Sequence, residues 1–174
     1  MEKNSVTYHQ NPRVDFLFGY FGGDPVPTKQ DKFKPIEVAQ IMDDGTEQIL
    51  NNFYVKKPDE KAMLEFYTYI QSLAKGQFAD GGKILHPHKV EAILSVCSTE
   101  KRFKTIDVDN LAKAILDSLN GIAYEDDSQV VSLICKKYIH PMKCNGLFIG
   151  ITKLTETNMG FGEDIKLFSN KPWK

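Results

Sequence analysis

A short amphipathic helix between two strand-like segments constrains the fold of this chain more than any other feature. Within "DVDNLAKAILDSLNG" apolar residues recur every three or four positions, and Asn120-Gly121 supplies a C-terminal stop, so the pattern predicts a helix over about residues 109–120. The flanking segments "HKVEAILSVCS" and "QVVSLICKKYI" read as strands. The apolar positions of the helical pattern are Val108, Leu111, Ala112, Ile115, Leu119 and Ile122.

Acidic residues gather around this helix. Asp107 precedes it, Asp109 opens its first turn, and Lys113 and Asp117 follow at intervals of four. The ordinary interpretation is an N-cap at Asp107 and a surface ion pair between Asp109 and Lys113. The loop after the helix adds another acidic pair, which ends at Asp127. Carboxylates held close together repel one another unless a positive charge lies between them.

Three of these carboxylates, if they meet, form a site for a divalent cation. Asp107, Asp109 and Asp127 offer the hard oxygen ligands that suit Mg²⁺ or Mn²⁺. A helix of about 12 residues is roughly 18 Å long. The loop after it therefore meets its start only if the helix packs obliquely on the sheet.

The rest of the chain adds strands and a second helix. "VDFLFGYFGG" predicts a strand that enters the loop "DPVPTKQDKFKP", whose cations are Lys29, Lys32 and Lys34. Residues 37–55 contain "DDGT", typical of a hairpin turn, and residues 58–76 show a helical period closed by a glycine. "GLFIGITKL" predicts a last strand, which we expect to pair antiparallel with "QVVSLICKKYI". The prediction is one α/β domain over residues 1–174, a mixed β-sheet with two principal helices, with residues 155–174 unassigned.

Composition and motifs exclude several classes of protein. The chain has 22 Lys and Arg against 23 Asp and Glu, so DNA binding would need local basic patches. Its 3 cysteines form no CxxC pair, which argues against a zinc site or a secreted disulfide framework and favours buried free thiols. No apolar run suits a membrane span or a signal peptide, so we expect a cytoplasmic protein. An EF-hand is excluded because Ala112 and Ser118 occupy its glycine and glutamate positions.

The stretch "DVDNLAKAILDSLNGIAYEDDSQVV" resembles the signature of the RusA family of Holliday junction resolvases, often encoded by phages and prophages. The shared pattern is Asp-x-Asp-Asn-Leu-x-Lys, an Asp four residues beyond the Lys, and a loop that ends in Asp-Asp-x-Gln-Val. The specific match covers residues 105–130. Family members usually carry more arginine before the first Asp, where this chain has "KRFKTI".

The resemblance implies a Mg²⁺-dependent endodeoxyribonuclease that acts as a homodimer on four-way DNA junctions in recombination and repair. Carried over by position, Asp107, Asp109 and Asp127 would be metal ligands and Lys113 would support phosphodiester cleavage, so these four form the expected catalytic set. The candidate DNA-binding cations are Lys29, Lys32, Lys34, Lys101, Arg102 and Lys104.

Two other functions remain open at the level of sequence. The chain is a non-catalytic nucleic-acid-binding module if its acids serve only as caps and solvated surface. It is a nuclease for flaps or other branched DNA if the chemistry is kept and the substrate differs. Response to Mg²⁺ separates the first alternative from an enzyme, and the choice of DNA substrate separates the second.

Overall fold

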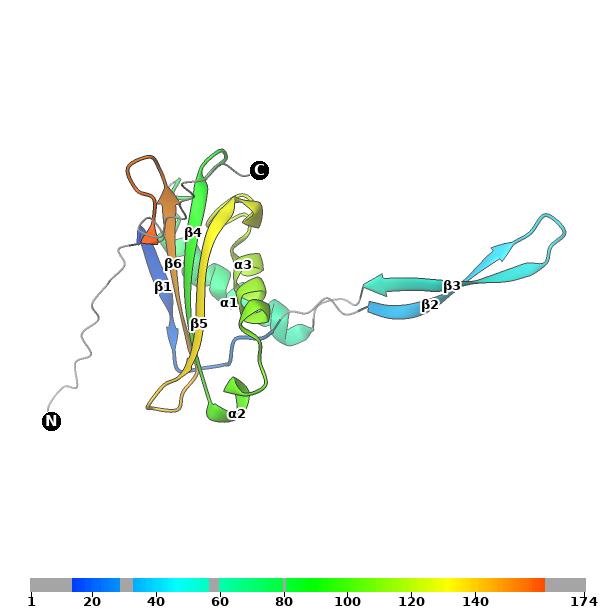
Figure 1. The fold of residues 1–174 in the computed structure, drawn as a ribbon, viewed down its shortest axis with the longest axis horizontal. Coiled ribbons are helices and arrows are strands. Elements are labelled where there is room, and N and C mark those ends of the chain that lie inside the picture. Colours follow the sequence, from blue (N-terminus) through cyan, green and yellow to red (C-terminus); the bar gives the residue numbers. More distant parts are fainter. Residues whose placement is uncertain (1–13, 29–32, 57–59, 80, 162–174) are drawn as a thin grey trace, which may run out of the picture.

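A four-stranded sheet with helices on one face forms the body of the protein, and a two-stranded arm projects from the body on the helical side (Figure 1). This computed structural model describes residues 14–28, 33–56, 60–79 and 81–161. The elements are β1 (Phe16–Phe21), β2 (Phe33–Ile41), β3 (Glu47–Lys56), α1 (Lys61–Gln77), β4 (Lys89–Ser98), α2 (Glu100–Phe103), α3 (Val108–Leu119), the 3₁₀ helix η1 (Asp127–Gln129), β5 (Val130–Ile139) and β6 (Gly146–Leu154). The predicted α/β class with a mixed sheet is confirmed. The extent of the domain over residues 1–174 stays a prediction.

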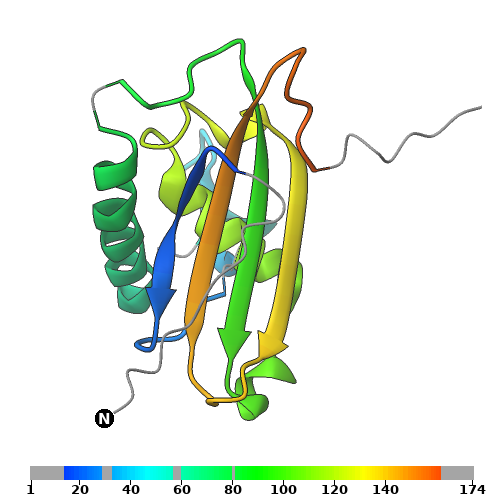
Figure 2. The ribbon, with the colours of Figure 1, turned by 90° about the vertical axis from the view of Figure 1, so that its left-hand side faces the viewer.

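The sheet has the order β1-β6-β4-β5 (Figure 2). β6 pairs antiparallel with both β1 and β4, whereas β5 pairs parallel with β4. The expectation that β5 and β6 are neighbours is therefore wrong. β4 takes the place between them because its side chains are buried on both faces, as a central strand requires, while β5 alternates between partly buried and exposed.

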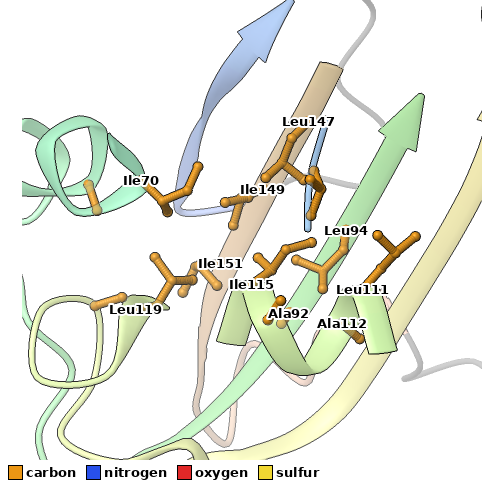
Figure 3. Packing of buried hydrophobic residues seen from close by; sticks show 14 of the residues in the cluster. Ile70, Ala92, Leu94, Leu111, Ala112, Ile115, Leu119, Leu147, Ile149 and Ile151 are labelled. Atoms are coloured by element: carbon orange, nitrogen blue, oxygen red, sulfur yellow. The ribbon is translucent and has the colours of Figure 1, made fainter. Parts of the chain in front are cut away.

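The core lies between the sheet and the two long helices. From α3, Leu111, Ile115 and Leu119 pack toward the strands that carry Leu94 and Ile149, and all five side chains are fully buried (Figure 3). The helix predicted over residues 109–120 is confirmed within one residue at each end. One apolar position departs from the pattern, since Val108 is 38% exposed at the start of α3.

Helix α1 covers the other half of the same face. Its buried residues recur at helical spacing, as the sequence predicts, and Phe78 just beyond it packs against two β1 rings, those of Phe16 and Phe18. This contact closes the core at the β1 edge. The buried residues of the helix are Met63, Phe66, Ile70 and Ala74.

The arm consists of β2 and β3, and its hairpin confirms the turn predicted from "DDGT". Gly45 has a φ of 82°, a conformation that favours glycine, and the Asp44 carboxylate accepts hydrogen bonds from the N–H and hydroxyl of Thr46. Lys34, expected in the preceding loop, lies exposed on β2. An isolated hairpin has no core of its own. The large side chains that the arm leaves exposed are Phe33, Ile36, Ile41, Ile49, Phe53, Tyr54 and Val55.

The segment after β6 is fixed to the face of the sheet opposite the helices. There the buried Glu91 carboxylate accepts hydrogen bonds from the Phe161 N–H (2.7 Å) and the Ser132 hydroxyl (2.8 Å). A Cβ at Gly160 would lie 2.7 Å from that carboxylate. Residues 155–161, which the sequence left unassigned, are thus held by one buried acid.

The structure also bears on two expectations from the sequence, those on membrane-spanning segments and on the cysteines. No helix in the described ranges is both long and apolar enough to span a bilayer. All 3 cysteines are free, with Cys97 buried and Cys135 and Cys144 partly buried, so the expectation of buried thiols holds fully only for Cys97.

Replacing Ile115 with Ala tests the role of α3 in the core. The side chain is fully buried, so its loss should lower the free energy of unfolding by about 2–5 kcal/mol in a urea titration. Leu64→Ala on α1 is the control, because that side chain is 54% exposed and should change stability by less than about 0.5 kcal/mol. Similar losses for the two variants would contradict this description of the core.

Candidate functional site

Asp107 and Asp109 lie together at the N-terminal end of α3. Asp107 occupies the N-cap position, and its backbone carbonyl accepts the Leu111 N–H at 3.2 Å, but its carboxylate makes no capping hydrogen bond. Asp109 is in the first turn, and both acids are exposed. The positive end of the helix dipole stabilises anions here. The interpretation of Asp107 as a side-chain N-cap is therefore wrong, and its carboxylate is not engaged in closing the helix.

The chain before α3 is held in place by β5. The Lys137 ammonium donates to the backbone carbonyls of Phe103 (3.0 Å) and Ile106, and it lies 4.8 Å from the centroid of the Phe103 ring. The Cys135 thiol donates to the Val108 carbonyl at 3.7 Å, and burial raises the pKa of this thiol to about 11. These bonds position the backbone on both sides of Asp107. The Lys137 ammonium is thus directed at the protein backbone.

Lys113 follows Asp109 by one helical turn and is exposed. Residues four apart on a helix share one flank, so the ammonium and the Asp109 carboxylate lie on the same side of α3. Asp117, four residues further along the same flank, is partly buried and lies close to Tyr124. The polar residues of this flank thus extend from Asp109 toward the C-terminal end of the helix.

Asp127 lies near that other end. The buried Tyr124 hydroxyl donates to the Leu116 carbonyl at 2.9 Å, in the C-terminal half of α3. Burial raises the pKa of Tyr124, and the nearby carboxylates of Asp127 and Asp117 raise it further. Asp127 is exposed as the first residue of η1 and lies near Tyr124, on the side of the C-terminal half of α3.

Asp126 and Gln129 form the turn that precedes β5. The Asp126 carboxylate accepts the Ser128 N–H at 3.0 Å, and the Gln129 side-chain oxygen accepts the Asp126 N–H at 3.3 Å, so the two make a capping box. Hydrogen bonding from Ser128 lowers the pKa of the Asp126 carboxyl. The Gln129 amide also donates to the His88 carbonyl at 2.9 Å, next to β4. Two of the five residues of "DDSQV" thus shape the loop.

The structure does not bring Asp127 to Asp107 and Asp109 within one chain. Among the residues that it describes, no three His, Cys, Asp or Glu side chains lie where they could hold a metal ion. The reason is topological. β4, α3 and β5 form a βαβ unit, so α3 runs opposite to its two parallel strands. Asp107 follows the end of β4 and Asp127 precedes the start of the neighbouring parallel strand β5, so the two acids lie at opposite ends of these strands.

A signal for this separation was present in the sequence. Two strands joined by a crossover that contains a helix are typically parallel, and that arrangement alone places the two groups of acids apart.

A comparison with protein-family models identifies the family of the chain. The model described as "Endodeoxyribonuclease RusA" matches residues 23–152 of the chain. The chain belongs to the RusA family.

The RusA match begins after β1 and contains β2, β3, both long helices, β4, β5 and β6 up to Thr152. It therefore includes the arm as well as the four expected catalytic residues. Among curated proteins, none matches the chain.

The predicted DNA-binding cations of this RusA chain have different surroundings. "KRFK" lies in and directly after the short helix α2, with Lys101 exposed and Lys104 paired to Glu100 at 2.9 Å. The Arg102 guanidinium donates to the Val26 carbonyl, so it also ties the segment after β1 to α2. Lys29 and Lys32 lie outside the described residues.

Lys137→Met tests the anchoring of the segment before α3. The variant keeps an apolar stem but removes the donors to two carbonyls, so unfolding free energy should fall by about 1–3 kcal/mol. Lys136→Met is the control, because the neighbouring Lys136 is exposed and makes no such bonds to the segment before α3. Equal effects in chemical denaturation would refute the anchoring role.

Asp126→Ala tests the capping box. A lowered carboxyl pKa means that the folded state favours the charged form, so its stabilisation is present at neutral pH and is lost as pH falls below about 4. Asp126→Ala should lower the melting temperature at pH 7 and approach wild type in acid. Asp126→Asn, which keeps an acceptor oxygen but loses the charge, should melt between wild type and Asp126→Ala at pH 7. A stability gap for Asp126→Ala that is independent of pH would show that the charge plays no part.

Proposed function

We propose that the chain is an endodeoxyribonuclease that cleaves four-way DNA junctions as a homodimer, in DNA recombination and repair, with Mg²⁺ or Mn²⁺ as cofactor. The observation that supports this most directly is the Asp107 and Asp109 pair. Both carboxylates are exposed at the N-terminus of α3, inside the segment that matches the RusA family, and Asp109 lies one helical turn before Lys113.

Phosphodiester hydrolysis requires an attacking hydroxide, neutralisation of the charged transition state and help for the leaving oxygen. A bound Mg²⁺ would supply the hydroxide and part of the neutralisation. The Lys113 ammonium, on the flank shared with Asp109, would bind the scissile phosphate. It also reduces repulsion between the carboxylates when DNA is absent.

The donor set of one chain is smaller than the expected metal site. Asp107 and Asp109 provide two carboxylates at this end of α3, whereas the expectation requires three. Mg²⁺ is commonly held by one or two carboxylates together with substrate phosphates. Within the described residues, a single chain therefore does not contain the expected three-carboxylate metal site.

DNA must approach a locally acidic surface on a chain whose net charge is -1. Lys101 and Lys104 on and beside α2 are exposed just before Asp107. Together with Lys113 they give this end of the molecule cations that can meet the DNA backbone. Binding should therefore weaken as salt concentration rises.

Asp109→Asn tests the catalytic assignment. Neutralising this carboxylate should slow cleavage of a four-way junction by on the order of 100-fold or more, while the DNA-facing cations keep binding close to wild type. Cleavage is followed on denaturing gels, with Mg²⁺, with Mn²⁺ and with a chelator, and binding by gel shift.

Asp43→Asn, the same charge change in the turn of the arm, is the matched control and should cleave normally. A loss of binding as large as the loss of cleavage in Asp109→Asn would contradict the assignment. Equal cutting of a flap or plain duplex would overturn junction selectivity while leaving the nuclease chemistry in place.

A further inference from the structure

A pocket of about 480 Å³ opens at the end of the sheet where β4 begins. The start of β1, the end of β6 and the segment that leads into β4 meet there (Figure 2). Gly81 and Gly82 form part of its wall, so no side chain fills the space next to them. The catalytic assignment does not use this pocket. The charged and imidazole side chains that line it are Asp15, Lys83, His86, His88 and Lys153.

Basic groups outnumber acids in this pocket. Lys83 and Lys153 are partly buried, whereas His86 and His88 are exposed. Within the described residues, no ion pair engages the ammonium of Lys83 or of Lys153. Two ammonium groups that share one pocket without a carboxylate partner repel each other unless an anion lies between them. The pocket therefore has the charge of an anion site.

The two carboxylates nearest to these basic residues are bound to the backbone. Asp15 Oδ2 accepts the Lys153 N–H at 2.8 Å, and Glu125 Oε2 accepts the His86 N–H at 2.7 Å. Each acid thus holds the main chain of a basic residue in position. Asp126 is also near, since His86 contributes to the lowered pKa of its carboxyl. His86 therefore lies between the pocket and the acidic loop before β5.

The segment that carries three of the basic residues is held rigidly against that loop. The Ile84 N–H donates to the Ala123 carbonyl at 2.9 Å, and the Ile84 side chain is buried. The Gln129 amide donates to the carbonyls of Ile84 (3.3 Å) and His88 (2.9 Å). These bonds fix the backbone before any ligand arrives. A preorganised pocket loses less conformational entropy when it binds.

Phosphate is the anion that suits both this pocket and the proposed function. DNA presents one phosphate charge at every nucleotide, and lysine side chains are common donors to it. Such contacts fix the position of a duplex and carry no sequence information. A chain with a net charge of -1 can bind DNA only through local basic patches, and this pocket is one of them.

We propose that this pocket binds a phosphate group of the DNA backbone, with Lys83 and Lys153 as the charged contacts and His86 and His88 as further donors. We call it the phosphate pocket. The inference rests on the proposed nuclease function, because it takes the DNA of that reaction as the ligand. It adds a DNA contact at the end of the body that is far from the N-terminus of α3.

The sheet gives the spacing between this contact and the cut. The Cys135 thiol reaches the Val108 carbonyl at the start of α3, and Cys135 is paired with Leu94 on β4. His88 precedes Leu94 by 6 positions. A strand rises about 3.3 Å per residue, so the phosphate pocket lies roughly 20 Å from the start of α3. A duplex that runs along the body covers this distance in about 6 nucleotides.

Lys83→Gln and Lys153→Gln, alone and together, test the phosphate pocket. The dissociation constant for a four-way junction is measured by fluorescence anisotropy over a range of salt, with a chelator present so that the DNA stays uncut. The double variant should bind on the order of 10-fold more weakly, since hydrogen bonds to a charged group are lost. The slope of log K against log salt should become shallower by about 1.

Two controls separate lost charge from lost structure. Lys61→Gln makes the same change at an exposed position outside the pocket and should bind like wild type. Arginine at both pocket positions, Lys83→Arg with Lys153→Arg, keeps the charges and should also bind like wild type. Thermal melting should give all variants a similar transition. If the double Gln variant is folded and binds the junction as Lys61→Gln does, the phosphate pocket is overturned.

A junction with one neutral methylphosphonate linkage locates the contact. Placed about 6 nucleotides from the cut, this linkage should weaken wild-type binding but should not weaken the double Gln variant further. Neutral linkages that meet other parts of the protein should weaken both proteins equally. If wild type and variant respond alike at every position, no backbone phosphate occupies the pocket and the proposal fails.

Inorganic phosphate tests the pocket without DNA. It should shift the imidazole NMR signals of His86 and His88 in wild type and leave them unchanged in the double Gln variant. If it does so while the variant binds DNA normally, the ligand is a free anion and the DNA contact is overturned. If wild type cuts no DNA, the proposed nuclease function fails, yet weaker DNA binding by the double variant would still establish the pocket.

Discussion

The direction in which α3 crosses the sheet determines where every acidic residue of interest lies. Its apolar stripe is fully buried against the sheet, and its ends are fixed by Lys137 near Ile106 and by Tyr124 near Leu116. Because the helix runs opposite to β4 and β5, the residues before it and after it cannot share one location. The packing that stabilises the domain therefore also separates Asp127 from Asp107 and Asp109, the other expected metal ligands.

The fold was largely predictable because its strongest signals are local. Helical period, strand alternation and the Asp44-Gly45 turn each act over a few residues and were read correctly. Strand order was not predictable in the same way, because it depends on which strand can be buried on both faces. The buried Glu91 hides that property of β4, since its partners, Ser132 and Phe161, are 41 and 70 residues away in sequence.

The candidate site shows the same division between local and distant information. The N-terminal placement of Asp107 and Asp109 followed from the helix pattern alone. The roles of Asp126, Gln129 and Lys137 did not, because each depends on contacts between separate elements. Part of what resembles a catalytic signature is therefore structural, as the capping box before β5 holds the turn that presents Asp127.

The arm of β2 and β3 takes no part in the packing of the sheet against the helices. Its strands pair with each other and contribute no side chain to the buried core. Changes in its length or sequence should therefore leave the stability of the body almost untouched. Such an appendage can diversify between relatives faster than the sheet and helices, and it offers a place where preference for a particular DNA shape can evolve without cost to folding.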